Sequence, residues 1–261
     1  MSILSNMSLA LNWVAVTALT FTALSACSSN PTIDPNFSER MGRYLEQSEN
    51  RKKIWESLER ALPIVKERHK TLRERQNTEI ANIIKSHQRI DTDCGMHEGE
   101  QDALIEIVEF SSFNCPHSRA SHEVIRQLMT TYPGQFHHVF KQYYSPDHGD
   151  VPAAAHIALA ANDLGRFEEM KAKLFEYQGD LDHATFRKIA QEMGIDFKKL
   201  DALYRKNLKE HDRIIRANIA QAEKLGVEAT PTFFINGVKV VGERNLDFFD
   251  ALLKRTNAEG R

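Results

Sequence analysis

The residues of this sequence with the clearest capacity for chemistry are the Cys-Pro-His-Ser segment at 115–118. It follows Leu104–Phe110, an apolar run with isoleucine and valine that predicts a buried strand. A helical pattern comes next and ends at Pro133-Gly134. Cys115 should therefore lie at a strand-to-helix turn, where unpaired backbone N–H groups and the positive end of the helix dipole stabilise a thiolate. The segment predicts an activated cysteine nucleophile.

The three residues after Cys115 are expected to support its thiolate. Pro116 suits the first turn of a helix, because its missing N–H would be unpaired there anyway. A protonated His117 would lower the pKa of the thiol, and the Ser118 hydroxyl can donate a hydrogen bond to the sulfur. The structural alternatives are an inert buried thiol, a surface histidine and a helix-stabilising serine.

Two motifs carry a resemblance to a known family. The segment IEIVEFSSFNCPHS resembles the strand, acid and Cys-Pro-His-Cys pattern of the DsbA-like branch of the thioredoxin superfamily, and GVEATPTFFING at 226–237 resembles its second motif. The helical stretch at 150–178 is similar as well. The resemblance covers about residues 91–258. It implies an α/β fold, a thioredoxin fold with an inserted all-helical subdomain at about 152–225.

The same resemblance implies roles for three further residues. Pro231 would be cis and would place the Thr230 backbone beside the Cys115 sulfur, where it pairs with a substrate strand. Glu109 would be a buried proton shuttle near the thiol. Because a carboxylate within an apolar strand costs free energy unless it is paired, the alternative for Glu109 is a salt-bridged structural acid.

The sequence departs from the family pattern at Ser118, which stands where the family has its second cysteine. Serine cannot form the disulfide in which a dithiol oxidase carries its oxidising equivalent. One interpretation is monothiol isomerase or reductase chemistry at Cys115. In a second, Cys94 resolves the mixed disulfide. In a third, the protein is a non-catalytic or chaperone-like lipoprotein that binds unfolded or partner proteins at the same groove.

The N-terminus predicts export and a lipid anchor. Residues 1–26 end in an uncharged apolar run and a Leu-Ser-Ala sequence before Cys27, which resembles a bacterial lipoprotein signal. The resemblance implies acylation of Cys27, a tether at 27–36, and, from Ser28, the outer membrane facing the periplasm. No lysine or arginine precedes the apolar run, and the alternative is an uncleaved anchor helix.

Residues 37–89 are dense in charge, and their apolar residues recur at helical spacing. Pro63 is expected to break or kink this pattern into two helices. The pair could dock on the domain or act as a spacer, and the alternative is a coiled-coil segment for homo-oligomerisation. This N-terminal helical extension precedes the thioredoxin domain.

The composition excludes two classes of protein. The 261 residues carry a formal charge of −2 and three cysteines, which excludes a disulfide-dense scaffold and a globally basic nucleic-acid-binding protein. No Cys/His spacing suits zinc, so we expect no metal and no cofactor. The expected partners are exported protein substrates, a small thiol or membrane redox partner, and the membrane through the lipid anchor.

Overall fold

The computed structural model describes residues 43–144, 153–177 and 180–258. The predicted signal at 1–26, the acylation site Cys27 and the tether at 27–36 lie outside these residues. The chain divides into two units, 1–69 and 70–261. The unit from Lys70 onward contains the whole sheet and the residues of the candidate site.

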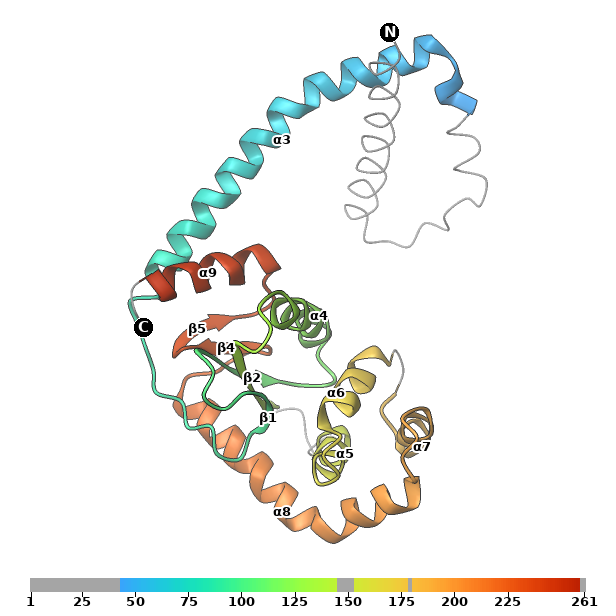
Figure 1. The fold of residues 1–261 in the computed structure, drawn as a ribbon, viewed down its shortest axis with the longest axis vertical. Coiled ribbons are helices and arrows are strands. Elements are labelled where there is room, and N and C mark those ends of the chain that lie inside the picture. The colour runs from blue at the N-terminus through green and yellow to red at the C-terminus, as the bar shows by residue number, and fades with distance from the viewer. Residues whose placement is uncertain (1–42, 145–152, 178–179, 259–261) are drawn as a thin grey trace. The chain divides into compact units, whose positions relative to one another are not determined.

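A five-stranded sheet with the order β1-β3-β2-β4-β5 forms the centre of this unit (Figure 1). β2 and β3 are parallel, and the other neighbouring pairs are antiparallel. The strands are β1 Met96–Gly99, β2 Ile105–Ser111, β3 Phe136–Gln142, β4 Thr232–Ile235 and β5 Val238–Val241.

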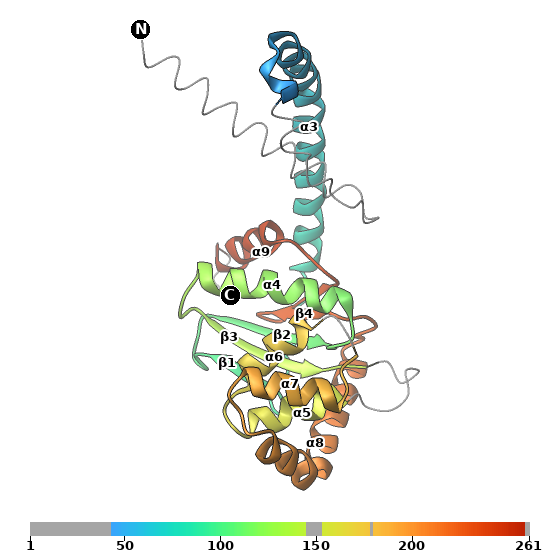
Figure 2. The same cartoon turned by 90° about the vertical axis from the view of Figure 1, so that its right-hand side faces the viewer.

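The side chains of β2 alternate between the two faces of the sheet, and each face packs against helices. Ile105 and Ile107 face a cluster formed with helices α4 (Pro116–Thr131) and α9 (Leu246–Ala258). Val108 and Phe110 face the opposite cluster, which includes Ala222 of α8. A strand buried on both faces has an almost continuous apolar sequence, which is why this run was recognisable as a strand. Figure 2 shows α4 and α9 on one side of the sheet.

A turn at Asn236-Gly237 joins β4 to β5, and both residues have positive φ, 47° and 83°. A side chain at Gly237 would also meet the backbone of Gln88, because its Cβ would lie 2.6 Å from the Gln88 oxygen. The turn therefore needs glycine both for its backbone conformation and for the close approach of the segment before β1.

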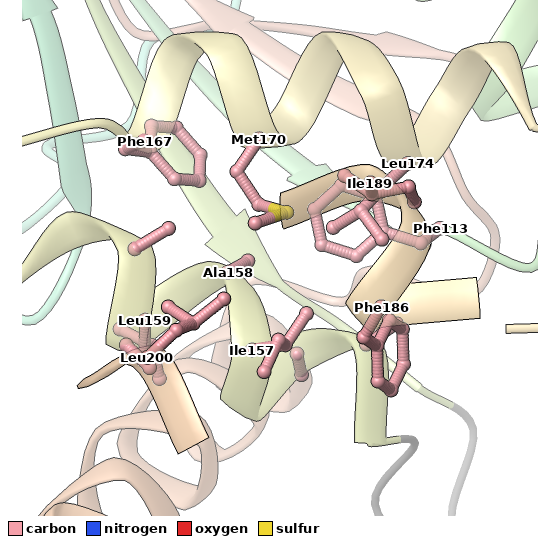
Figure 3. Close-up of a cluster of buried hydrophobic side chains, with 14 of the residues drawn as sticks. Phe113, Ile157, Ala158, Leu159, Phe167, Met170, Leu174, Phe186, Ile189 and Leu200 are labelled. Atoms are coloured by element: carbon pink, nitrogen blue, oxygen red, sulfur yellow. The ribbon is translucent and has the colours of Figure 1, made fainter. Parts of the chain in front are cut away.

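The predicted helical insertion is present and has its own core. Its helices are α5 Ala153–Asn162, α6 Phe167–Glu176, α7 His183–Glu192 and α8 Phe197–Lys224. Figure 3 shows side chains such as Ile157, Met170 and Phe186 from different helices packed together. α8 begins at Phe197, because Asp196 caps it by accepting a hydrogen bond from the Lys198 N–H at 2.9 Å. The predicted thioredoxin fold with an inserted helical subdomain is confirmed.

The expectation that Pro63 separates two helices is wrong. Pro63 lies inside one helix, α3, which runs from Ser48 to Ile83. A proline removes one backbone hydrogen bond, to the carbonyl four residues earlier. Strong helix formers such as Glu59 and Ala61 precede it and favour continuation.

The final part of the charged segment belongs to the folded domain. Ile80 and Ile84 are buried in the cluster beneath α9, and His87 forms an isolated bridge with Val238 of the edge strand β5. The N–H of Gln88 donates to the Gly237 carbonyl at 2.9 Å. Residues from Lys70 onward thus pack with the domain whose strand signals begin only after 91.

Candidate active site

Cys115 is the N-cap residue of α4, with an extended backbone, and Pro116 opens the helix as expected. The Cys115 carbonyl accepts the first helical hydrogen bond, from the Arg119 N–H at 3.1 Å. The thiol is half-buried and donates to the Thr230 carbonyl, with 3.2 Å between sulfur and oxygen. The Thr230–Pro231 peptide bond is cis. The fold thus brings together the Cys115 motif and the Thr230-Pro231 motif, which lie 115 positions apart in the sequence.

The surroundings of the sulfur favour its thiolate. Burial raises the pKa of Cys115, but hydrogen bonds outweigh burial, and the pKa lies below its ordinary value. The strongest hydrogen bond comes from the Thr230 side chain, followed by the backbone N–H and hydroxyl of Ser118 and the backbone N–H of His117. The first turn of α4 therefore acts as expected of a helix N-terminus, through N–H groups that have no partner within the helix.

Ser118 lies in the first turn of α4, and its side chain is fully buried. Its hydroxyl oxygen accepts from the Ser112 N–H at 3.4 Å, so it connects the helix to the end of β2 while also reaching the sulfur. The two roles weighed for Ser118, thiolate stabilisation and support of the helix, are compatible in this geometry.

His117 extends into solvent, with 68% of its side chain exposed. Its Nδ1 lies 3.1 Å from Oε2 of Glu243, in the segment between β5 and α9. A carboxylate only accepts hydrogen bonds, so Nδ1 must donate. The contribution of His117 to the thiol pKa comes through its backbone N–H. The sequence offered no signal for Glu243, which is 126 positions away.

A pocket of about 550 Å³ lies beside the site. The segment after β5 forms one wall and is tied to the cis-proline, because the Gly242 N–H donates to the Pro231 carbonyl at 2.8 Å. The pocket is lined by His117, Val124, Ala229, Thr230, Gly242, Glu243, Arg244 and Asn245. It is large enough for a side chain or a small thiol next to the Cys115 sulfur.

Glu109 is fully buried and belongs to an ionic network. Its Oε2 lies 3.0 Å from Nε2 of His138, and Nδ1 of His138 lies 2.7 Å from Oε2 of Glu98. Lys171 of α6 donates to the same Glu98 oxygen at 2.5 Å. Burial raises the pKa of Glu109, but the hydrogen bond and charge of His138, the charge of Lys171 and a hydrogen bond from Ser111 together outweigh burial and lower this pKa. An ionised, paired carboxylate fits the structural alternative better than a proton shuttle.

His138 completes the charge balance of this network. Both its ring nitrogens face carboxylates that only accept, so both must carry protons. Burial and the charge of Lys171 lower the pKa of His138, but the hydrogen bonds to Glu109 and Glu98 and the charge of Glu98 together outweigh them and raise it. The cations of His138 and Lys171 thus balance the two carboxylates. Sequence reasoning missed Glu98 and Lys171.

Cys94 does not lie with Cys115. Both cysteines are free, and the Cys94 sulfur lies 3.9 Å from Nη1 of Arg213 on α8. The Lys141 amine donates to the Asp93 carbonyl, beside Cys94. Lys141 and His138 are three positions apart on β3, so their side chains point to opposite faces of the sheet. Cys94 therefore lies near the face opposite the buried network. Cys115 caps α4, which packs on the other face of the sheet. The structure therefore does not bring the proposed resolving pair together.

Two absences hold for the residues that the structure describes. No group of three or more His, Cys, Asp or Glu side chains in them could hold a metal ion. No helix in the described ranges is long and apolar enough to cross a membrane.

The fold and site define a class: a thioredoxin-fold protein with a cysteine at the N-terminus of the first sheet-covering helix and a cis-proline segment against its sulfur. The sequence model of a family described as Thioredoxin matches residues 91–255. The chain belongs to this thioredoxin family.

Solved structures share the fold. A thioredoxin-like oxidoreductase from Silicibacter pomeroyi is 23% identical, with a TM-score of 0.58 over 66% of this chain and 99% of that one. The thiol-disulfide exchange protein alpha-DsbA2 from Wolbachia pipientis is 21% identical, with a TM-score of 0.59 over 70% and 98%. A ScsC variant from Proteus mirabilis, 18% identical with a TM-score of 0.53, covers 88% of this chain and 100% of its own.

The relatives found by sequence similarity carry a different name and are much longer than this chain. A protein named Na(+)/H(+) antiporter NhaA 1 from Salinispora arenicola is 28% identical over 172 residues, 65% of this chain and 26% of its own length. The chain thus spans about a quarter of the length of this relative, and the antiporter name describes that longer protein.

Proposed function

We propose that this protein is a cell-envelope thiol-disulfide oxidoreductase that acts through one active-site thiolate, as an isomerase or reductase of exported proteins. The carrying observation is Cys115 at the N-terminus of α4, with a lowered pKa and with Ser118 in place of a second cysteine. Exchange then proceeds without a local resolving thiol. The thiolate attacks a substrate disulfide, one sulfur joins Cys115 as a mixed disulfide, and the other leaves with the electron pair.

A second thiol completes the cycle. When it belongs to the same substrate, attack on the mixed disulfide regenerates the Cys115 thiolate and leaves a rearranged disulfide, which is isomerisation. When it belongs to a small thiol, the substrate leaves reduced and a further small thiol releases the adduct as an oxidised dimer. Thr230 and Pro231 would align the substrate strand, since their backbone lies against the sulfur.

The first experiment is intact-mass measurement after equilibration of the full chain with oxidised glutathione. Cys27→Ser leaves Cys94 and Cys115 as the only thiols. We expect one glutathione adduct on Cys115, lost in Cys115→Ser and retained in the matched control Cys94→Ser. Loss of two hydrogens without an adduct would replace this proposal with a Cys94–Cys115 dithiol cycle. No modification would favour a protein that only binds unfolded or partner proteins at the pocket.

We also propose that the mature chain is anchored by acylated Cys27 in the outer membrane and faces the periplasm. The support is the Leu-Ser-Ala-Cys sequence at 24–27 and Ser28. A structurally similar protein from Salmonella enterica serovar Typhimurium is described as periplasmic. Cys27→Ala should move the protein from the membrane fraction to the soluble fraction, and an unchanged distribution would contradict acylation.

Oligomerisation through residues 37–89 is a further part of the proposal. In α3, Trp55, Leu62 and Val65 are each at least 47% exposed, and they recur at helical spacing on one side of the helix. An apolar stripe that is this exposed suits helix–helix association between copies of the chain.

A further inference from the structure

The pocket beside Cys115 contains a paired imidazole and carboxylate that the proposed cycle does not yet use. His117 and Glu243 both line it, and so does Thr230, whose carbonyl accepts from the Cys115 sulfur at 3.2 Å. The pair therefore faces the space that a disulfide must enter to reach the thiolate.

The carboxylate fixes which ring nitrogen can meet a ligand. Nδ1 of His117 donates to Glu243 Oε2 at 3.1 Å, and Nε2 has no hydrogen bond to any described residue. With Nδ1 protonated, Nε2 is a base in the neutral ring and a donor in the imidazolium. A histidine that is oriented by a carboxylate and presents its second nitrogen to the reacting group is a recurring arrangement for proton transfer.

The segment that carries Glu243 is held in place from both sides. The Gly242 N–H donates to the Pro231 carbonyl at 2.8 Å, and Arg244 Nη2 donates to Glu79 Oε1 at 2.7 Å. Glu243 is thus fixed relative to the cis-proline segment that would align the substrate. The exposed pair contributes little to stability, so its placement bears on the pocket more than on folding.

Resting on the proposed function, we infer that His117 is a proton-transfer catalyst for the substrate sulfurs and that Glu243 is its positioning residue. In the first step the Cys115–sulfur bond forms, the substrate S–S bond breaks, and the leaving sulfur takes a proton from Nε2 of the imidazolium. In the second step the attacking thiol returns a proton to Nε2, its sulfur bonds to the substrate sulfur, and Cys115 leaves as thiolate. Protons and electrons balance over the cycle.

The acidity of the leaving thiol tests this role. An acidic aromatic thiolate leaves readily without a proton, whereas a weakly acidic alkyl thiolate benefits from protonation as it leaves. In a Cys27→Ser, Cys94→Ser background, Glu243→Gln keeps the side-chain shape and removes the charge. We expect it to slow reaction with bis(2-hydroxyethyl) disulfide about tenfold, and to leave reaction with 2,2′-dithiodipyridine within about twofold.

The control is Glu228→Gln, which removes an exposed carboxylate two positions before Thr230, whereas the carboxylate bonded to His117 is that of Glu243. It should change neither rate. His117→Gln should show the same selectivity as Glu243→Gln, and more strongly for the alkyl disulfide. Equal slowing of both disulfides, or of neither, would overturn the inference. Because the glutathione adduct on Cys115 is measured separately, this result is distinguishable from failure of the proposed function.

Discussion

Ser118 is the residue that most directly constrains the chemistry. Its hydroxyl reaches the Cys115 sulfur from the first turn of α4, the position from which a second thiol would resolve a mixed disulfide. The side chain is fully buried, so the site keeps the shape of a dithiol centre while lacking its second sulfur.

Ser118→Cys should therefore convert the monothiol site into a dithiol site. In the Cys27→Ser, Cys94→Ser background, we expect the variant treated with oxidised glutathione to lose two hydrogens and retain no stable adduct. The parent should keep the adduct. The measurement is intact mass followed by peptide mapping. A persistent adduct on the variant would mean that position 118 is not within disulfide reach of Cys115.

At the scale of elements, α4 connects the site to the buried network and the insertion. His122 lies seven positions after Cys115 on α4, and its ring stacks on Phe175 of α6 with 5.0 Å between centroids. Burial, followed by the positive charge of Lys171, lowers the pKa of His122 to about 4. The charges of Glu109 and Glu98 raise this pKa in part, and the charge of His138 lowers it. The ring is therefore neutral in the folded protein well below pH 6.5.

This shift predicts a pH dependence of stability. Between pH 6.5 and about 4 the unfolded chain binds a proton at His122 that the folded chain does not, so His122 makes stability fall as pH falls. His122→Phe retains a ring against Phe175 and removes the titration. We expect the free energy of unfolding, measured with urea, to fall less from pH 7 to pH 5 in the variant than in the parent.

The comparison with the parent isolates His122. His138, whose pKa is raised, contributes stability at low pH that is lost as pH rises, and this contribution is present in both proteins. An identical pH dependence in the variant and the parent would contradict a depressed pKa for His122.

At the scale of the whole molecule, the exposed stripe of α3 bears on assembly. Leu62→Glu places a charge within the stripe, and in a self-associating helix this charge would be desolvated between chains. We expect light scattering to show a smaller mass for the full-length variant than for the parent. Arg60→Glu, on the opposite side of α3, is the matched control and should leave the mass unchanged. A monomeric parent would contradict oligomerisation.

Local patterns in the sequence were sufficient to predict the class of fold and to locate the candidate reactive centre. The apolar run before Cys115, the Cys-Pro-His-Ser segment and the Thr-Pro motif are short, and their chemistry depends on neighbours within a few positions. The helices of the insertion were predictable for the same reason, because periodicity and capping are local. Pro63 was misjudged because a local helix-breaking preference was outweighed by its helical context.

Only the tertiary structure decided which distant side chains meet. Glu243 reaches His117, and Lys171 reaches Glu98, because packing of helices on the sheet brings together segments far apart in the chain. The same packing separates Cys94 from Cys115 and includes Ile80 in the core. Such pairings leave no periodic signal in the sequence, since their geometry is fixed by long-range contacts rather than by neighbouring residues.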